Sequence, residues 1–144
     1  MNDLLIYTDS LQSLTYDRID DLMSLVSDDV HFRDPFNDCH GRAQYRAVFE
    51  DMFEQLEDIA FVVDYAAWVS VGDTAPLSSA LIKWNLSAQL QGKLWRIEGC
   101  SELHFNDGLL TAHYDYWDAA AGLYERFPLL GRVLTFLRRR IAAG

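Results

Sequence analysis

Two aspartates in aromatic surroundings are the side chains of this sequence that could do chemistry. The first, Asp34, precedes Pro35 and lies between Phe32 and Phe36. A carboxylate walled by apolar groups loses hydration and becomes a usable general base near neutral pH. Aspartate in such a segment also often caps a turn, so the sequence leaves both roles open for Asp34.

The second aspartate, Asp115, lies in an aromatic run that covers residues 113–118, HYDYWD. Successive side chains of a strand point to opposite faces, so His113, Asp115 and Trp117 share one face. If that face lines a pocket, an imidazole, a carboxylate and an indole meet there, a combination that suits acid–base chemistry. If the tyrosine face points inward instead, Asp115 is solvated.

The turn near residues 106–108 decides which side chains of the preceding strand accompany Asp115. A three-residue turn pairs Ser101 with His113 and gives that face a small and apolar set: Ser101, Leu103 and Phe105. A two-residue turn gives it Glu102 and His104, because a slip of one residue turns every side chain to the other face. We favour the longer turn, since leucine and phenylalanine are buried far more often than glutamate and histidine.

The turn near residues 91–93 leaves a similar choice open one strand earlier. With three residues in this turn, Lys83 and Asn85 lie on the Ser101 face, and with two or four residues Trp84 lies there. Asn85 is kept as a candidate ligand-binding residue on the first alternative.

Apolar periodicity predicts the elements that must position these groups. Helical spacing covers residues 3–14, about 15–26 and 42–56, whereas strand patterns cover 30–34, 59–71, 79–90, 94–105 and 109–117. In the segment 59–71 every odd position is apolar, which predicts one buried face. Helices followed by strands indicate the α+β class, with helices packed on a long curved antiparallel sheet. We expect one domain over residues 1–144, with a C-terminal helical extension over 124–142.

Charge and composition exclude several classes of function. The formal net charge is −10, whereas phosphate binding needs a basic face, so we expect no nucleic-acid partner. No stretch approaches the roughly 18 apolar residues of a membrane span, and the first residues lack a signal-peptide pattern, which predicts a cytoplasmic protein without membrane binding. Neither histidine nor cysteine spacing matches a zinc motif, so no metal is expected.

These segments resemble the nuclear transport factor 2-like superfamily, and within it the SnoaL-like proteins. The resemblance rests on Asp28-Asp29-Val30, on the segment 32–36, on Gly41, on Asp107-Gly108 and on the run 113–118. It covers nearly the whole chain and implies a cone-shaped fold that encloses a pocket.

Two enzyme groups of this superfamily allow a comparison by residue. Asp34-Pro35 is similar to the base of ketosteroid isomerases, which implies an oxyanion role for Tyr7, although Ser101 stands where they have a protonated aspartate. Asp115 is similar to the acid of limonene-epoxide hydrolases, although Lys83 and Asn85 stand where they have an Arg-x-Asp pair. The sequence therefore carries half of each site.

We therefore expect a pocket for a small hydrophobic, oxygen-bearing molecule. If the protein is an enzyme, Asp34 or Asp115 moves a proton without a cofactor, as isomerisation, cyclisation or hydration requires. Seven residues are predicted to bind the ligand: Tyr7, Phe49, Phe53, Asn85, Ser101, His113 and Trp117. The alternative is a non-catalytic binding or interaction domain. Apolar residues at even as well as odd positions of 59–71, Ala66 and Trp68 among them, further predict a homodimer through the outer face of the sheet.

Overall fold

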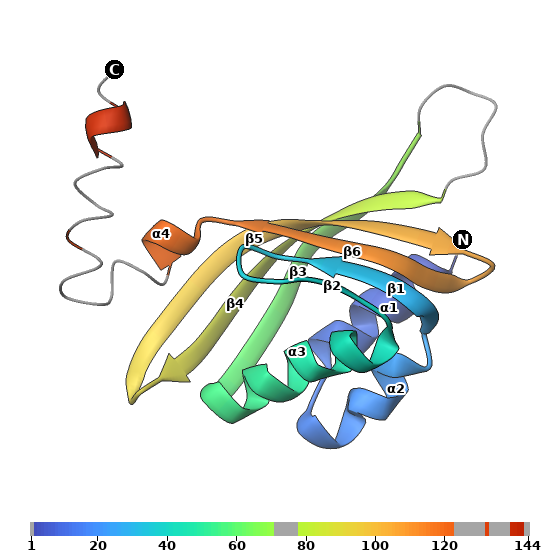
Figure 1. The fold of residues 1–144 in the computed structure, drawn as a ribbon, viewed down its shortest axis with the longest axis horizontal. Helices are drawn as coiled ribbons and strands as arrows, with labels where there is room; N and C mark the ends of the chain where they lie inside the picture. Colours follow the sequence, from blue (N-terminus) through green and yellow to red (C-terminus); the bar gives the residue numbers. More distant parts are fainter. Residues whose placement is uncertain (1, 71–77, 123–131, 133–138, 143–144) are drawn as a thin grey trace.

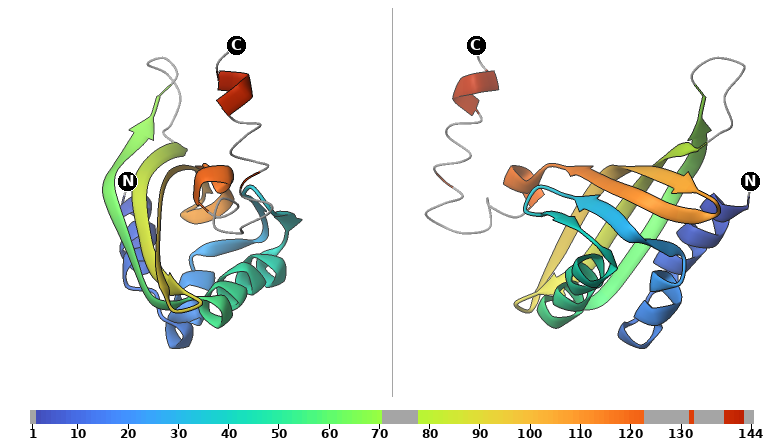
Figure 2. Two further views of the ribbon diagram at one scale, coloured as in Figure 1. Left: turned by 90° about the vertical axis from the view of Figure 1, so that its left-hand side faces the viewer. Right: turned by 45° about the vertical axis from the view of Figure 1, so that its right-hand side comes forward.

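The structure is a computed structural model that describes residues 2–70, 78–122, 132 and 139–142. Three N-terminal segments, α1 (Asp3–Gln12), the short 3₁₀ helix η1 (Tyr16–Arg18) and α2 (Ile19–Met23), precede the longest helix, α3 (Arg42–Gln55). The strands are β1 (Val26–Arg33), β2 (Asp38–His40), β3 (Glu57–Val69), β4 (Ser79–Leu90), β5 (Lys93–Asn106) and β6 (Leu109–Trp117). Helices α1 to α3 cover the concave face of the curved sheet (Figure 1, Figure 2), which confirms the α+β class.

The six strands form one sheet in the order β2-β1-β6-β5-β4-β3. The long strands β3 to β6 make the predicted antiparallel meander. The sheet is not wholly antiparallel, however, because β1 pairs with β6 in parallel. Strand β1 pairs with the edge of the meander at β6, and the chain then turns back through β2 into α3. The N-terminal strands thus extend the sheet beyond β6.

Helix α3 closes the cone opposite the meander. Gly41, with φ 95°, turns the chain out of β2, and the helix begins at the next residue. Its inward stripe repeats at the spacing of an α-helix, and Tyr45 and Phe49 are buried against the sheet. The predicted period of this helix is therefore confirmed.

Strand β3 corrects one prediction about which side chains face inward. Its odd positions point to the core from Ile59 to Val63, but the pairing with β4 shifts between Val63 and Tyr65. Beyond that β-bulge the even residues Ala66 and Trp68 pack against the core, and Tyr65 is 64% exposed. The extra residue reverses the alternation, which a pattern of apolar residues alone does not reveal.

The turn near residues 106–108 is shorter than predicted, and the turn near residues 91–93 takes the two-residue alternative. Leu90 pairs with Lys93 across a two-residue Gln91-Gly92 turn, and Asn106 pairs with Leu109 across Asp107-Gly108. All four turn residues have φ between 50° and 81°, as the tightest hairpin turns require. Two-residue loops match the right-handed twist of the strands better than longer ones, and this preference outweighed the burial argument for the longer turn.

A second bulge nevertheless gives the Asp115 face the predicted set of neighbours. The β5–β6 register shifts between His104 and Phe105, so Ser101, Leu103 and Phe105 still point to the core. Ser101 pairs with Asp115 rather than with His113.

The chain leaves the sheet through a short helix, α4 (Ala119–Gly122). The predicted extension over 124–142 lies outside the described residues, apart from residue 132 and residues 139–142. Within the described part of the chain, no helix combines the length and the apolar character needed to cross a bilayer.

Candidate functional site

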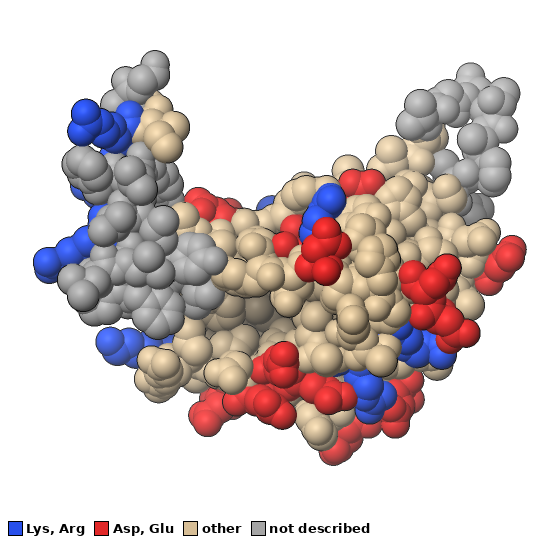
Figure 3. Space-filling view, in the orientation of Figure 1, with Lys and Arg blue, Asp and Glu red and all other residues tan. Residues whose placement is uncertain are grey.

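A cavity of about 730 Å³ lies between α3 and the concave face of the sheet. Figure 3 shows a hollow between the β1–β2 hairpin and α3, with acidic side chains gathered below it over the helices. Aromatic side chains from both layers line it: Phe32, Phe49, Phe53, Trp84, Trp95 and Trp117. The titratable groups among these apolar walls include Asp34, His113 and Asp115. A concave, mostly apolar space with a few convergent polar groups is the usual form of a small-molecule site.

Asp115 is held at the cavity wall by two hydrogen bonds to one of its oxygens. The Oδ1 atom accepts a hydrogen bond of 2.5 Å from Ser101 Oγ, and it lies 2.6 Å from His113 Nε2. Trp84 Nε1 in turn donates to Ser101 Oγ at 2.8 Å. Among the described residues, none donates to Oδ2, so the second oxygen is available to a ligand.

The partners of His113 indicate which of its nitrogens carries the proton. Its Nε2 faces the Asp115 carboxylate, which accepts, whereas its Nδ1 lies 2.8 Å from the hydroxyls of both Tyr7 and Tyr45. A ring that donates from Nε2 and accepts at Nδ1 fits these contacts, with one tyrosine hydroxyl donating to Nδ1 and the other to the first hydroxyl. The two tyrosine hydroxyls also hydrogen-bond to each other. The whole network therefore donates toward Asp115.

Burial keeps both tyrosines in their neutral, donating form. It raises the pKa of Tyr7 well above the ordinary value of 10.0, and it does the same for Tyr45. For Tyr45 the neighbouring Tyr7 adds to the effect. A neutral hydroxyl can donate to His113, whereas a phenolate would place a second anion behind Asp115.

Replacing Tyr7 with phenylalanine is expected to make stability less sensitive to alkaline pH. Unfolding exposes a tyrosine that ionises near pH 10, whereas the folded chain keeps it protonated. The unfolded state therefore binds fewer protons above about pH 10, and the free energy of unfolding falls by up to about 1.4 kcal/mol per pH unit for each such tyrosine. Urea unfolding from pH 7 to 11 measures this slope.

The exposed Tyr16 provides the matched control, because its hydroxyl lies outside the network. The Tyr16→Phe variant should show the wild-type slope above pH 10, and Tyr7→Phe a shallower one. Equal slopes in Tyr7→Phe and the wild type would show that Tyr7 ionises in the folded chain.

Asp34 lies at the tip of the β1–β2 hairpin and serves there as a turn cap. Its Oδ1 atom accepts hydrogen bonds from the backbone N–H groups of Phe36 and Asn37, at 2.8 and 2.6 Å. The side-chain amide of Asn37 also donates to it at 3.0 Å. Asp34 lines the same cavity as Asp115, so the capping role does not remove it from the site.

The structure places the other candidate residues in three groups. Phe49, Phe53, His113 and Trp117 line the cavity, while Tyr7 and Ser101, each 1% exposed, lie behind its wall. Ser101 donates a hydrogen bond to Asp115, and Tyr7 is hydrogen-bonded to His113. The placement of Asn85 was wrong. Its side chain points to the outer face and donates to Asp64 at 2.7 Å, because the two-residue turn after β4 directs Trp84 inward.

Tyr45 and Trp84 are the residues of this site that sequence reasoning did not assign to it. Tyr45 was noted only as one apolar position in the period of α3. A tyrosine on a buried helical stripe still needs a partner for its hydroxyl, and that requirement was the available signal. For Trp84 the available signal was the length of the turn after β4, because a two-residue turn places Trp84 on the same face as Ser101.

Solved structures confirm the fold at low sequence identity. A protein of the nuclear transport factor 2-like fold and unknown function from Exiguobacterium sp. 255-15 is 20% identical with a TM-score of 0.68, and the match covers 81% of this chain and 98% of that one. A protein with a ketosteroid isomerase-like fold from Catenulispora acidiphila, in complex with trimethylamine, is 13% identical with a TM-score of 0.69, covering 83% and 88%. An epoxide hydrolase similar to limonene-epoxide hydrolase, from M. tuberculosis, is 14% identical with a TM-score of 0.68, covering 95% and 96%.

Comparison with curated protein sequences finds no match. A model of the SnoaL-like domain, by contrast, matches residues 7–113. This range contains the second half of α1, the helices η1, α2 and α3, the strands β1 to β5 and the first half of β6, and ends at His113 of the site. The chain therefore belongs to the SnoaL-like domain family.

Proposed function

We propose that this chain binds a small hydrophobic, oxygen-bearing molecule in the cavity and that Asp115 transfers a proton to or from it without a cofactor. The observation that carries the proposal is the arrangement of Asp115. Ser101 and His113 fix one carboxylate oxygen, no described residue donates to the other, and Asp115 lines a mostly apolar cavity. A positioned carboxylate in a poorly hydrated site is the arrangement that general acid–base catalysis requires.

The proposed chemistry is a proton transfer at Oδ2 of Asp115. As a base, this oxygen takes a proton from one of two donors. From a carbon next to a carbonyl, the electron pair left behind forms an enolate. From a water, the water oxygen bonds to an epoxide carbon while the ring C–O bond breaks, and the resulting alkoxide needs a proton. The protonated carboxyl group then returns the proton to another atom. Isomerisation, cyclisation and hydration each need such a transfer, and the structural neighbours include an epoxide hydrolase. Asp34, which follows the strand paired with β6 and lines the same cavity, is the proposed second group.

Tryptophan fluorescence tests the binding half of the proposal. Three of the four tryptophans, Trp84, Trp95 and Trp117, line the cavity, so a ligand there should change the emission. We expect terpene-sized ketones and epoxides to bind more tightly than the hydrocarbons of the same shape, because the oxygen meets polar groups in the cavity. Equal affinity for each matched pair, or no change in emission with any of them, would contradict the proposal.

A non-catalytic binding domain is the second candidate. It is favoured by the hydrogen bonds that hold Asp34 in a turn, since they give one of the two candidate carboxylates a structural role. Mass spectrometry of the bound compound after incubation separates the candidates, because an enzyme converts it and a binding domain returns it unchanged.

A homodimer through the outer face of the sheet is also proposed. Ala66, Trp68 and Trp84 point inward and no longer support it, but Val62, Tyr65 and Tyr116 remain more than half exposed on that face. Sedimentation at tens of micromolar should show a dimer, and a monomer alone would contradict it.

The cytoplasmic location stays a prediction.

A further inference from the structure

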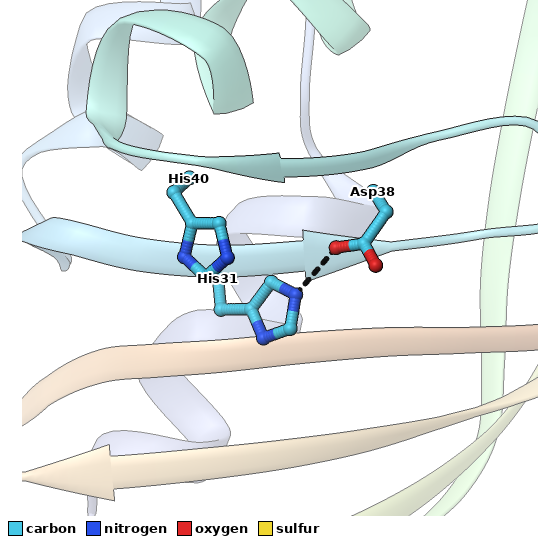
Figure 4. Close-up of side chains that lie close together, drawn as sticks. All are labelled: His31, Asp38 and His40. Atoms are coloured by element: carbon cyan, nitrogen blue, oxygen red, sulfur yellow. Dashed lines mark hydrogen bonds and ion pairs between the residues drawn. The ribbon is translucent and has the colours of Figure 1, made fainter.

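Three potential metal ligands meet on the β1–β2 hairpin, on the face of the sheet opposite the cavity. Asp38 and His40 are two residues apart on β2, so they project from the same side of that strand. His31 is directly paired with His40 across the hairpin, which brings its ring to the same side. Figure 4 shows the three side chains together, with Asp38 and His40 reaching from one strand toward His31 on the next.

The distances between the three side chains fit a single small cation. One ligand atom from each residue can be chosen so that all three lie within 4.8 Å of one another. His31 Nε2 is already 2.6 Å from Asp38 Oδ1, and the two imidazole rings are stacked with their centroids 4.1 Å apart. Ligand atoms 2.0–2.1 Å from a tetrahedral ion are about 3.3 Å apart, so the three side chains are close enough to share one ion once the two rings turn out of their stacked arrangement.

The surroundings of His31 are those of a histidine oriented for metal binding. Its other ring nitrogen, Nδ1, lies 2.9 Å from the Tyr114 hydroxyl, which fixes the ring with Nε2 toward Asp38. Histidines that bind metals usually have such a partner on the second nitrogen. The neighbouring cation, Arg33, is partly engaged elsewhere, because it lies over the Tyr114 ring at 4.6 Å and donates to the Tyr116 hydroxyl.

Asp38 is available as an anionic ligand. The side chain is 62% exposed, which leaves a path for an ion from solvent.

We propose that His31, Asp38 and His40 bind one divalent transition-metal ion, with zinc as the best fit to two imidazoles and one carboxylate. The ion replaces the proton between His31 and Asp38 and keeps an open position for water. The site closes the base of the hairpin whose tip carries Asp34, so its occupation stiffens one wall of the cavity. This proposal is independent of any reaction at Asp115.

The site was missed in the sequence because its ligands do not follow a zinc motif. Such motifs place histidines on one helix or cysteines in pairs, whereas here eight residues lie between His31 and His40, its partner across a hairpin. Strand β2 itself was not predicted, and without it Asp38 and His40 have no reason to share a side.

Calorimetric titration of the metal-free full chain with zinc chloride tests the proposal. We expect one ion per chain, with binding weakened at least about tenfold in Asp38→Asn and in His40→Gln, and no uptake of magnesium, which prefers oxygen ligands. His104→Gln is the matched control. His104 is also on the outer face and also contacts a carboxylate, Glu102, at 2.6 Å, but it lies outside the cluster.

Nitrogen-15 NMR of the histidine rings provides a second measurement that does not depend on the variants. Zinc should shift the ring signals of His31 and His40 and leave those of His104 and His113 in place. The proposal is overturned if zinc does not bind at concentrations up to 1 mM, if both cluster variants bind as the wild type does, or if the His104→Gln variant loses the ion.

Discussion

Replacing Asp115 with asparagine is expected to lower turnover by about 10²- to 10⁴-fold, the usual contribution of a general acid or base. Asparagine keeps the shape of the side chain and still accepts from Ser101, but it has no proton to exchange. Ligand affinity should therefore change only a few-fold. Product formation from an epoxide or ketone that binds in the cavity measures the first quantity, and tryptophan fluorescence measures the second.

Asp118→Asn is the matched control for this prediction. Asp118 belongs to the same aromatic run, but its Oδ1 accepts from the backbone of Ala121 at the start of α4, and asparagine caps a helix equally well. Its turnover should equal that of the wild type. Full turnover in Asp115→Asn, with a loss in Asp34→Asn instead, would assign the proton transfer to Asp34.

Replacing Trp84 with alanine is expected to reduce the free energy of unfolding by about 3–5 kcal/mol, the cost of emptying a large aromatic position in a core. The indole is 3% exposed, packs at 5.4 Å from the ring of Phe61, and donates to Ser101. Urea unfolding at neutral pH measures the loss. The variant should also lose ligand affinity, because Ser101 no longer has the donor that orients it toward Asp115.

Gly99 is the packing partner that makes this prediction specific. A Cβ atom at Gly99 would lie 2.6 Å from Trp84 Cζ2 and 2.8 Å from the carbonyl oxygen of Tyr116. Gly99→Ala should therefore cost about 1–3 kcal/mol in the wild type and less in the Trp84→Ala background, because the indole is gone. Cys100→Ala, at the next, exposed position, should change stability by less than about 0.5 kcal/mol. Strict additivity of the Trp84 and Gly99 variants would show that the two residues do not pack on each other.

The sequence predicted where the helices and strands of this fold lie better than it predicted which of their side chains face the core. Apolar periodicity located α3 and the long strands, because an element that buries one face repeats its apolar residues at the period of a helix or a strand. The bulges near Asp64 and near Phe105 each add one residue to a strand without changing its composition. Which residues face inward beyond a bulge therefore depends on pairing with the neighbouring strand. The apolar pattern of a single segment carries no information about that pairing.

The candidate site was predictable to the extent that it lies on β6. Alternation alone put His113, Asp115 and Trp117 on one face, and the structure places all three at the cavity. Tyr45, by contrast, meets His113 only because α3 crosses the concave face at that height, which is a property of the packed layers. Trp84 lies where Asn85 was considered, because the turn that follows β4 has two residues rather than three.

A crystal structure of the protein with a ligand bound tests the central claim most directly. After incubation with a hydrophobic ketone or epoxide that changes the tryptophan emission, the ligand should lie between α3 and the sheet. Its oxygen or its reacting carbon should then be within about 3.5 Å of Oδ2 of Asp115. A ligand bound elsewhere, or one in the cavity whose oxygen is turned away from both Asp115 and Asp34, would contradict the account.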